Sequence, residues 1–139
     1  MRSPGAAVVV TAVSLVFAQQ TARSVGDGVY TEEQARRGEA LGGKECASCH
    51  GAGLTGGEEA PALAGDAFLA NWNGLTVGDL FDRIRKTMPQ DNPGRLTRQQ
   101  DADILAYMLA LNRFPAGKTE LPPQSEVLQQ IKIETVKAK

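Results

Sequence analysis

The sequence predicts an all-α domain with about three main helices joined by long loops. Three segments each begin with a threonine followed three residues later by an acidic residue or a glutamine, the pattern of an N-terminal capping box or its close variant. These pairs are Thr31 with Gln34, Thr76 with Asp79, and Thr97 with Gln100. No run of the chain alternates apolar and polar residues convincingly enough to be a strand.

The second and third expected helices each carry one apolar face. In the second, apolar residues recur at the i, i+3, i+4, i+7 and i+11 spacing of a single helical face, and a broad apolar stripe follows the third. The second face consists of Val77, Leu80, Phe81, Ile84 and Met88, and the third of Ile104, Leu105, Met108, Leu109 and Leu111.

Glycine and proline gather between these helices, at 51–65 and 89–94, which we interpret as long loops. Loops of this length need a large rigid ligand to pack on. After a break at 115–123, the tail from 125 to 139 has two possible forms. It is either a short amphipathic helix using Val127, Leu128 and Ile131, or an extended segment lying on the domain.

The most specific motif is Cys46-Ala47-Ser48-Cys49-His50. Two thiols three positions apart with an adjacent histidine form the covalent attachment site of a c-type haem. Each thiol adds to one haem vinyl group to give a thioether, and the histidine is left facing the iron. The motif predicts one covalently attached haem c per chain, with Cys46 and Cys49 as anchors and His50 as the proximal ligand.

Three other interpretations of the motif compete with haem attachment. A thioredoxin-type redox pair normally follows a strand in a βαβ pattern, which this sequence lacks. A structural zinc site usually takes four Cys or His ligands, and this chain has two cysteines and one histidine. The third alternative is a chance match in a surface loop.

The length of 139 residues predicts one domain, in which a haem would form much of the core. Residues 1–18 resemble a secretory signal, with Arg2 before an apolar stretch and a small-residue cleavage site at Ala18. We therefore expect a signal peptide at 1–18, a linker at 19–30, the haem domain at 31–115 and a tail at 116–139. The alternative is an uncleaved membrane anchor, although this run is shorter than a membrane span. Nothing later in the chain is apolar enough to span a bilayer.

The net charge argues against nucleic acid as a partner. Cleavage removes Arg2, so 14 basic residues (15 minus 1) face 16 acidic ones and the formal charge becomes −2. Nucleic-acid binding depends on basic patches, and no basic stripe alternates with the sparse aromatic residues. The export signal also places haem attachment outside the cytoplasm, in the periplasm.

The second axial ligand decides the function, because a saturated iron passes electrons and an open one binds small molecules. Met88 is the best candidate. It ends an amphipathic helix, precedes Pro89 and lies well downstream of His50, so its loop can reach the opposite haem face. Its soft thioether favours ferrous iron and raises the potential. Met108, inside the last expected helix, is interpreted as core packing.

The chain resembles the class I cytochromes c over 31–114, with the family's motifs in the family's order. The resemblance implies the corresponding fold, with about three main helices and long loops around one covalent haem. Within that family, the segments at 71–74 and 78–81 are similar to the cytochrome domains associated with quinoprotein alcohol dehydrogenases. The motifs are an N-terminal helix with Gly38, Cys46-Ala47-Ser48-Cys49-His50-Gly51, Pro61-Ala62-Leu63-Ala64-Gly65, Met88-Pro89, and Ile104-Leu105-Ala106-Tyr107-Met108.

The resemblance implies roles for individual residues. The Pro61 carbonyl would accept a hydrogen bond from Nδ1–H of His50, and Leu63 would press on the haem face. Trp72 would donate its indole N–H to a haem propionate, or else serve as a core aromatic residue. Arg83 or Arg85 would neutralise the propionate, or else be solvated helix charges. Gly38 would let the first helix approach the last one closely, near Tyr107.

One position departs from the family. Family members usually carry an aromatic residue four positions before the first haem cysteine, where this chain has Gly42, followed by Gly43. A glycine inside a helix costs about 1 kcal/mol relative to alanine. We therefore expect the first helix to end early or fray, and to pack weakly on Tyr107.

The functional prediction is an exported electron carrier that performs no bond chemistry itself. Its expected donor is a periplasmic dehydrogenase, a quinoprotein dehydrogenase by the resemblance, and its acceptor an oxidase or another cytochrome. Docking is expected at the haem edge, beside the small residues Gly51, Ala52, Gly53 and Ala60. The alternative is a haem with an open sixth site that binds a diatomic gas or reduces peroxide. That alternative lacks a second histidine to support it.

Overall fold

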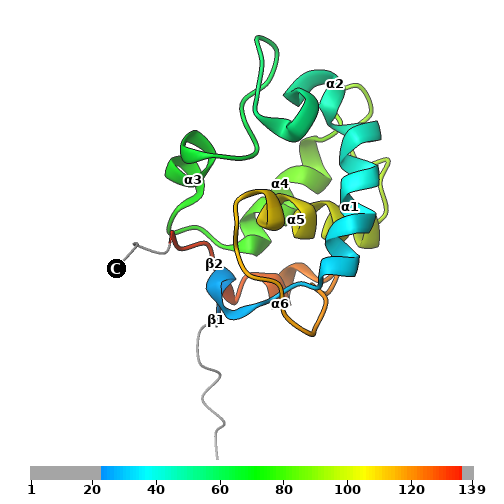
Figure 1. The fold of residues 1–139 in the computed structure, drawn as a ribbon. Coiled ribbons are helices and arrows are strands. Elements are labelled where there is room, and N and C mark those ends of the chain that lie inside the picture. The colour runs from blue at the N-terminus through cyan, green and yellow to red at the C-terminus, as the bar shows by residue number, and fades with distance from the viewer. Residues whose placement is uncertain (1–22, 136–139) are drawn as a thin grey trace, which may run out of the picture.

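The computed structural model describes residues 23–135, so the expected signal peptide at 1–18 lies outside the described residues. The fold is all-α, as predicted, and three long helices dominate it (Figure 1). These are α1 (Glu32–Glu45), α4 (Val77–Thr87) and α5 (Arg98–Leu111). The short elements are β1 (Arg23–Ser24), η1 (Val25–Asp27), α2 (Ala47–His50), η2 (Ala52–Leu54), α3 (Asp66–Trp72), α6 (Ser125–Leu128) and β2 (Ile131–Lys132).

The three threonines begin the three long helices, as the sequence predicts. Thr76 and Thr97 each form a complete capping box, in which the side chain three residues later returns a hydrogen bond to the threonine N–H. Thr31 accepts a hydrogen bond from the Gln34 N–H, but the Gln34 side chain does not complete a box. It instead bonds both backbone groups of Leu121, at 3.0 and 2.8 Å, which attaches the C-terminal segment to α1.

Helix α1 does not end early, so the expected fraying at Gly42 and Gly43 is wrong. The helix continues to Glu45, and the Cys46 N–H still donates to the Gly42 carbonyl at 3.0 Å. A Cβ atom on Gly42 would lie 3.1 Å from two ring atoms of Tyr107, so the aromatic ring lies directly against the bare backbone. This tertiary contact outweighs the low helix propensity of glycine.

The crossing of α1 over α5 depends on Gly38. A Cβ atom there would lie 1.8 Å from the Asp103 carbonyl oxygen and 2.9 Å from Cβ of Tyr107. Only a residue without a side chain allows the two helix backbones to approach so closely. The close approach implied by the family resemblance is thus confirmed at this residue.

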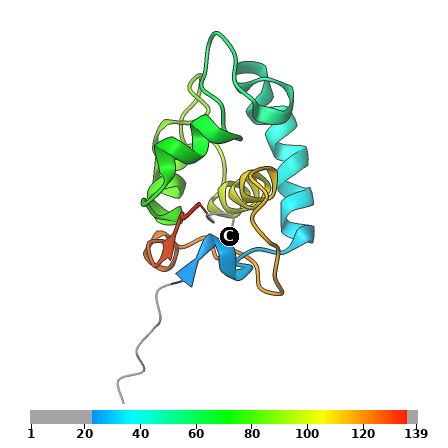
Figure 2. The ribbon, with the colours of Figure 1, turned by 60° about the vertical axis from the view of Figure 1, so that its left-hand side comes forward.

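The segments on either side of the three-helix core pack onto it (Figures 1 and 2). Residues 23–30, placed in a linker by the sequence, contribute buried side chains, and β1 pairs in parallel with β2 near the other end of the chain. The tail combines both forms that the sequence left open, because a four-residue helix is followed by a two-residue strand. The buried apolar residues of these segments are Val25, Val29, Tyr30, Leu121, Leu128, Ile131 and Ile133.

Residues 133–135 of the tail are bonded to the turn between α3 and α4. The Gly74 N–H donates to the Ile133 carbonyl, and the Ile133 N–H donates to the Leu75 carbonyl, both at 2.8 Å. The Thr135 N–H donates to Oδ1 of Asn73 at 3.0 Å. Among the helices of residues 23–135, none is long and apolar enough to cross a membrane.

Candidate functional site

A cavity of about 750 Å³ opens between α2, α3, the end of α4 and the inner side of α5. This volume lies within the range of about 300–1,000 Å³ that is typical of cofactor sites. Mostly apolar side chains line it, with a few polar and charged ones. All seven site residues predicted from the sequence are part of this lining: Cys46, Cys49, His50, Pro61, Leu63, Trp72 and Met88.

The ring of His50 is buried and held by one backbone group. Its Nδ1 atom lies 2.6 Å from the carbonyl oxygen of Pro61. Because a carbonyl only accepts hydrogen bonds, Nδ1 carries the proton, and Nε2 retains the lone pair that can bind a metal. A hydrogen bond of this kind also fixes the orientation of the ring.

The two cysteines lie on the single turn that leads into His50. The N–H groups of Cys49 and His50 both donate to the Cys46 carbonyl, at 3.2 and 3.0 Å. Cys46 is half-buried, Cys49 is exposed, and both thiols are free. Burial and the charges of Glu45 and Asp101 raise the pKa of the Cys46 thiol to about 11. This turn therefore presents two thiols and an imidazole to the same cavity.

Two methionine side chains reach the cavity. Met88 follows the last residue of α4, is half-buried, and donates its N–H to the Ile84 carbonyl at 2.9 Å. Met108 lies inside α5 and is fully buried in the core, as the sequence predicts, but it also lines the cavity. Met88 is thus the methionine that a loop carries, and Met108 is the one fixed by helix packing.

Asn112, which sequence reasoning missed, joins the segment 63–65 to α5. Its amide donates to the carbonyls of Leu63 and Met108, at 3.0 and 2.8 Å, and its carbonyl accepts from the Gly65 N–H at 2.9 Å. The segment that contains Leu63 is thereby joined to α5. The available signal was an asparagine directly after a long apolar helix, which is a C-cap position.

The two arginines proposed as partners of a haem propionate lie in different places in the structure. Arg83 is exposed and lines the cavity. Trp72, which is half-buried, also lines it and packs on Phe68 at 6.2 Å between ring centroids. Arg85 is not part of the lining. Its guanidinium lies 3.8 Å from Asp101 and 5.7 Å from the centre of the Phe81 ring.

Asp101 is a buried carboxyl group that the sequence analysis did not identify. Its Oδ1 atom is buried without a hydrogen-bond partner. Desolvation raises its pKa to about 6, against the opposing charges of Arg85 and Arg98. The sequence shows only a polar residue in the first turn of a helix, a position that usually faces water.

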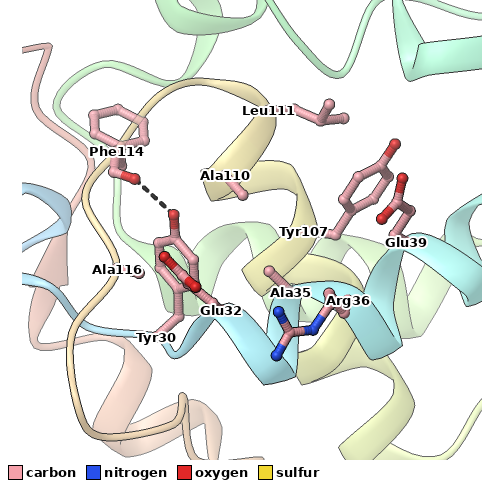
Figure 3. Close-up of a pocket in the computed structure, with 10 residues that line it drawn as sticks. All are labelled: Tyr30, Glu32, Ala35, Arg36, Glu39, Tyr107, Ala110, Leu111, Phe114 and Ala116. Atoms are coloured by element: carbon pink, nitrogen blue, oxygen red, sulfur yellow. Dashed lines mark hydrogen bonds between the residues drawn. The ribbon is translucent and has the colours of Figure 1, made fainter.

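A second hollow, of about 530 Å³, lies between α1 and α5 (Figure 3). The Tyr30 hydroxyl there donates to the Phe114 carbonyl at 2.6 Å, and Glu39 lies beside Tyr107. None of the predicted site residues lines this hollow. The bond from Tyr30 to Phe114 joins the segment before α1 to the segment after α5.

The donors at the larger cavity fit a haem. Two thiols and one imidazole come from a single turn, a thioether comes from the loop after α4, and apolar side chains such as Leu63, Leu80 and Ile104 form the walls. These are the ligand types found in c-type haem sites, and the apolar walls suit a flat aromatic ring.

Comparison with known proteins gives the same answer. The family model described as cytochrome C oxidase, cbb3-type, subunit III matches residues 33–108, which is more than half of the chain. The crystal structure of the sulfane dehydrogenase SoxCD from Paracoccus pantotrophus contains a similar chain, with 21% identity and a TM-score of 0.51. That similarity covers 77% of this chain and 61% of the other, and at this identity it shows the fold alone. No curated protein matches significantly.

The order of the motifs, the helical fold and the family match agree. The chain belongs to the class I cytochrome c family.

Proposed function

We propose that this protein is a single-haem c-type cytochrome that transfers one electron at a time. Cys46 and Cys49 would attach the haem through thioethers, and His50 and Met88 would occupy the two axial positions. The observation that carries this proposal is the convergence on one cavity of both thiols, the His50 ring with its Nδ1 bonded to Pro61, and the Met88 side chain. The family supports the coarser statement, an electron carrier with haem c.

Each cavity residue has a role in this function. When bound, the haem supplies a one-electron iron couple. The Pro61 carbonyl orients His50, and the thioether of Met88 favours the ferrous state and so raises the potential. Leu63 and Trp72 would exclude water from the faces of the haem, and the Trp72 indole N–H and Arg83 would satisfy a haem propionate. If His50 and Met88 both serve as iron ligands, no iron position would remain open to a substrate, so we propose a carrier rather than an enzyme.

We propose a quinoprotein dehydrogenase as the electron donor and an oxidase or another cytochrome as the acceptor. The sequence similarity at 71–74 and 78–81 supports the donor. The matched family and structure are described as an oxidase subunit and a sulfane dehydrogenase, both of which are redox proteins. The small residues Gly51, Ala52, Gly53 and Ala60 next to the attachment turn would permit close approach of a transient partner.

Export is the remaining part of the proposal. Residues 1–18 would direct the chain to the periplasm and be cleaved after Ala18. A bacterial host with a haem-attachment system tests this by cell fractionation and intact-mass measurement. We expect periplasmic protein that lacks residues 1–18. Membrane-bound protein of full mass would instead indicate an uncleaved anchor.

The absorption spectrum of the purified protein tests the haem site most directly. We expect the narrow bands of a thioether-linked haem, and a sulfur-to-iron charge-transfer band in the oxidised protein. A high-spin spectrum would mean an open sixth position and would favour a gas-binding or peroxide-reducing protein. Stopped-flow mixing of the oxidised protein with a purified quinoprotein alcohol dehydrogenase and ethanol then tests the donor.

A further inference from the structure

An ion pair joins the haem-attachment end of α1 to the loop that carries Met88. Glu45 is the last residue of α1 and immediately precedes Cys46. Arg95 lies in the loop between α4 and α5, and its Nε atom is 3.0 Å from Oε2 of Glu45. The Nη2 atom of Arg95 bonds the same oxygen. Both residues line the large cavity, so the pair lies at its wall.

The Glu45 carboxylate is largely withdrawn from water. Its side chain is 8% exposed, and that of Arg95 is 35% exposed. A charge pair in this setting is screened less than a surface pair. Lys44 also lies 3.7 Å from the other carboxylate oxygen of Glu45, but its side chain is 79% exposed, so this second pair is weak. Arg95 is therefore the main partner of the buried carboxylate, and its loss is costly. Arg95 also contacts Asp91 at 3.4 Å, but that carboxylate is 75% exposed and lies within the same loop. The contact with Asp91 therefore contributes little to holding the loop in place.

Arg95 provides the polar attachment between the loop and another element. Within the part of the chain that the structure describes, the other hydrogen bonds of residues 89–96 stay inside the loop or return to Met88. Examples are the N–H groups of Asn92 and Gly94, which donate to the carbonyls of Pro89 and Met88. Without Glu45, the loop would be attached through its covalent ends and through the packing of the buried Pro89 and of Leu96.

We propose that the Glu45–Arg95 pair is a positioning device that keeps Met88 on the iron. The proposal rests on the His50/Met88 ligation proposed above. The thioethers fix the haem next to Glu45, so a bond from Arg95 to Glu45 fixes the methionine loop relative to the haem itself. Thioether sulfur is a weak ligand, so the time it spends bound depends on how firmly its loop is held. Loss of the pair increases the fraction of molecules in which the loop swings away and the sixth position opens.

Carbon monoxide measures this opening, because it binds ferrous iron only when the methionine has left. We expect Arg95→Gln to bind carbon monoxide at least about tenfold faster than the parent, as expected for the loss of a charged hydrogen bond. The charge-transfer band of the oxidised variant should weaken. Asp91→Asn is the matched control, since it removes the exposed contact of the same arginine and should leave both readings unchanged.

A double variant in which the two charges are exchanged distinguishes a positioning role of the pair from general destabilisation of the protein. Glu45→Arg combined with Arg95→Glu restores a pair of opposite charges, and it should recover slow carbon monoxide binding relative to either single change. Arg95→Lys keeps the charge without the planar fork and should give an intermediate rate. If Arg95→Gln fails to fold with haem, these two variants still decide the question.

The results separate this proposal from the ligand assignment. A normal charge-transfer band and unchanged carbon monoxide kinetics in Arg95→Gln, even with lower thermal stability, would show a merely structural pair and overturn the proposal. A parent protein without the charge-transfer band, or with rapid carbon monoxide binding, would instead overturn the His50/Met88 ligation on which it rests.

Discussion

The Nδ1 atom of His50 lies 2.6 Å from the carbonyl oxygen of Pro61, which joins the end of the attachment turn to a loop eleven residues away. The bond determines which ring nitrogen bears the proton and leaves Nε2 as the possible ligand atom. Because the Asn112 side chain holds the neighbouring Leu63 and Gly65 on α5, the acceptor is itself fixed. The expected iron ligand is thus oriented by backbone that a helix supports.

Replacing both Cys46 and Cys49 with alanine should give a chain that neither retains haem through denaturation nor folds stably. The covalent links and much of the apolar core would be lost together. Denaturing gel electrophoresis with haem staining measures the attachment. Haem stain that persists in the double variant would refute covalent attachment at these cysteines.

Met88→Ala should open the sixth position, so that the reduced protein binds carbon monoxide rapidly while the parent resists it. Met108→Ala should leave the iron spectrum unchanged and lower the free energy of unfolding by roughly 2–5 kcal/mol, as a core truncation does. Carbon monoxide titration and urea unfolding of both variants test this. Because both methionines line the cavity, the reverse outcome would assign the ligand role to Met108.

Met88→His should lower the midpoint potential. The change keeps the iron six-coordinate but replaces a soft sulfur with a stronger nitrogen donor, which stabilises the ferric state. For a one-electron couple, each drop of about 59 mV makes the reduced form tenfold less favoured. Redox titration of the parent and the variant is the measurement. An unchanged potential with an unchanged spectrum would mean that Met88 does not contact the iron.

Replacing two glycines of α1 with alanine, one at a time, should change the free energy of unfolding in opposite directions. At Gly38 the new methyl group would lie 1.8 Å from the Asp103 carbonyl oxygen, so we expect a loss of about 3 kcal/mol or more as the helices separate. At Gly43 nothing lies within 4 Å, so alanine should stabilise the helix by about 0.5–1 kcal/mol. Urea unfolding compares the two variants. Equal effects would contradict the described crossing of α1 and α5.

The buried Asp101 should make stability fall as pH rises from about 4 to about 6. Its pKa is raised to about 6 in the folded state, so in this window the folded state binds more protons than the unfolded chain, and the free energy of unfolding decreases with pH. Asp101→Asn removes this dependence. As the pH rises to 7, the free energy of unfolding of the variant should increase relative to that of the parent by up to roughly 3 kcal/mol. Unfolding curves of both proteins between pH 4 and pH 7 test this. A constant difference across that range would contradict the raised pKa.

The sequence predicts well those features that depend on interactions between residues close together in the chain. Thr31, Thr76 and Thr97 begin helices because the capping oxygen bonds an N–H group only a few residues away. The end of α1 was misjudged because propensity does not reveal that the Tyr107 ring lies against Gly42.

Long-range partners were missed for the same reason. Asn112 and Asp101 look like ordinary polar residues until the fold brings Leu63 and Arg85 next to them. The Arg95–Glu45 pair spans 50 positions, and no local pattern indicates it.

The packed segments on either side of the three-helix core affect how the protein is best produced. The family match covers 33–108, but the folded unit includes apolar side chains well outside those limits. A polypeptide trimmed to the matched residues would lose Val25 and Val29 at one end and Leu121, Leu128 and Ile133 at the other, leaving bare the core surface that they cover. Exposed apolar surface of this kind promotes aggregation. Soluble expression therefore calls for boundaries that retain the described span of 23–135.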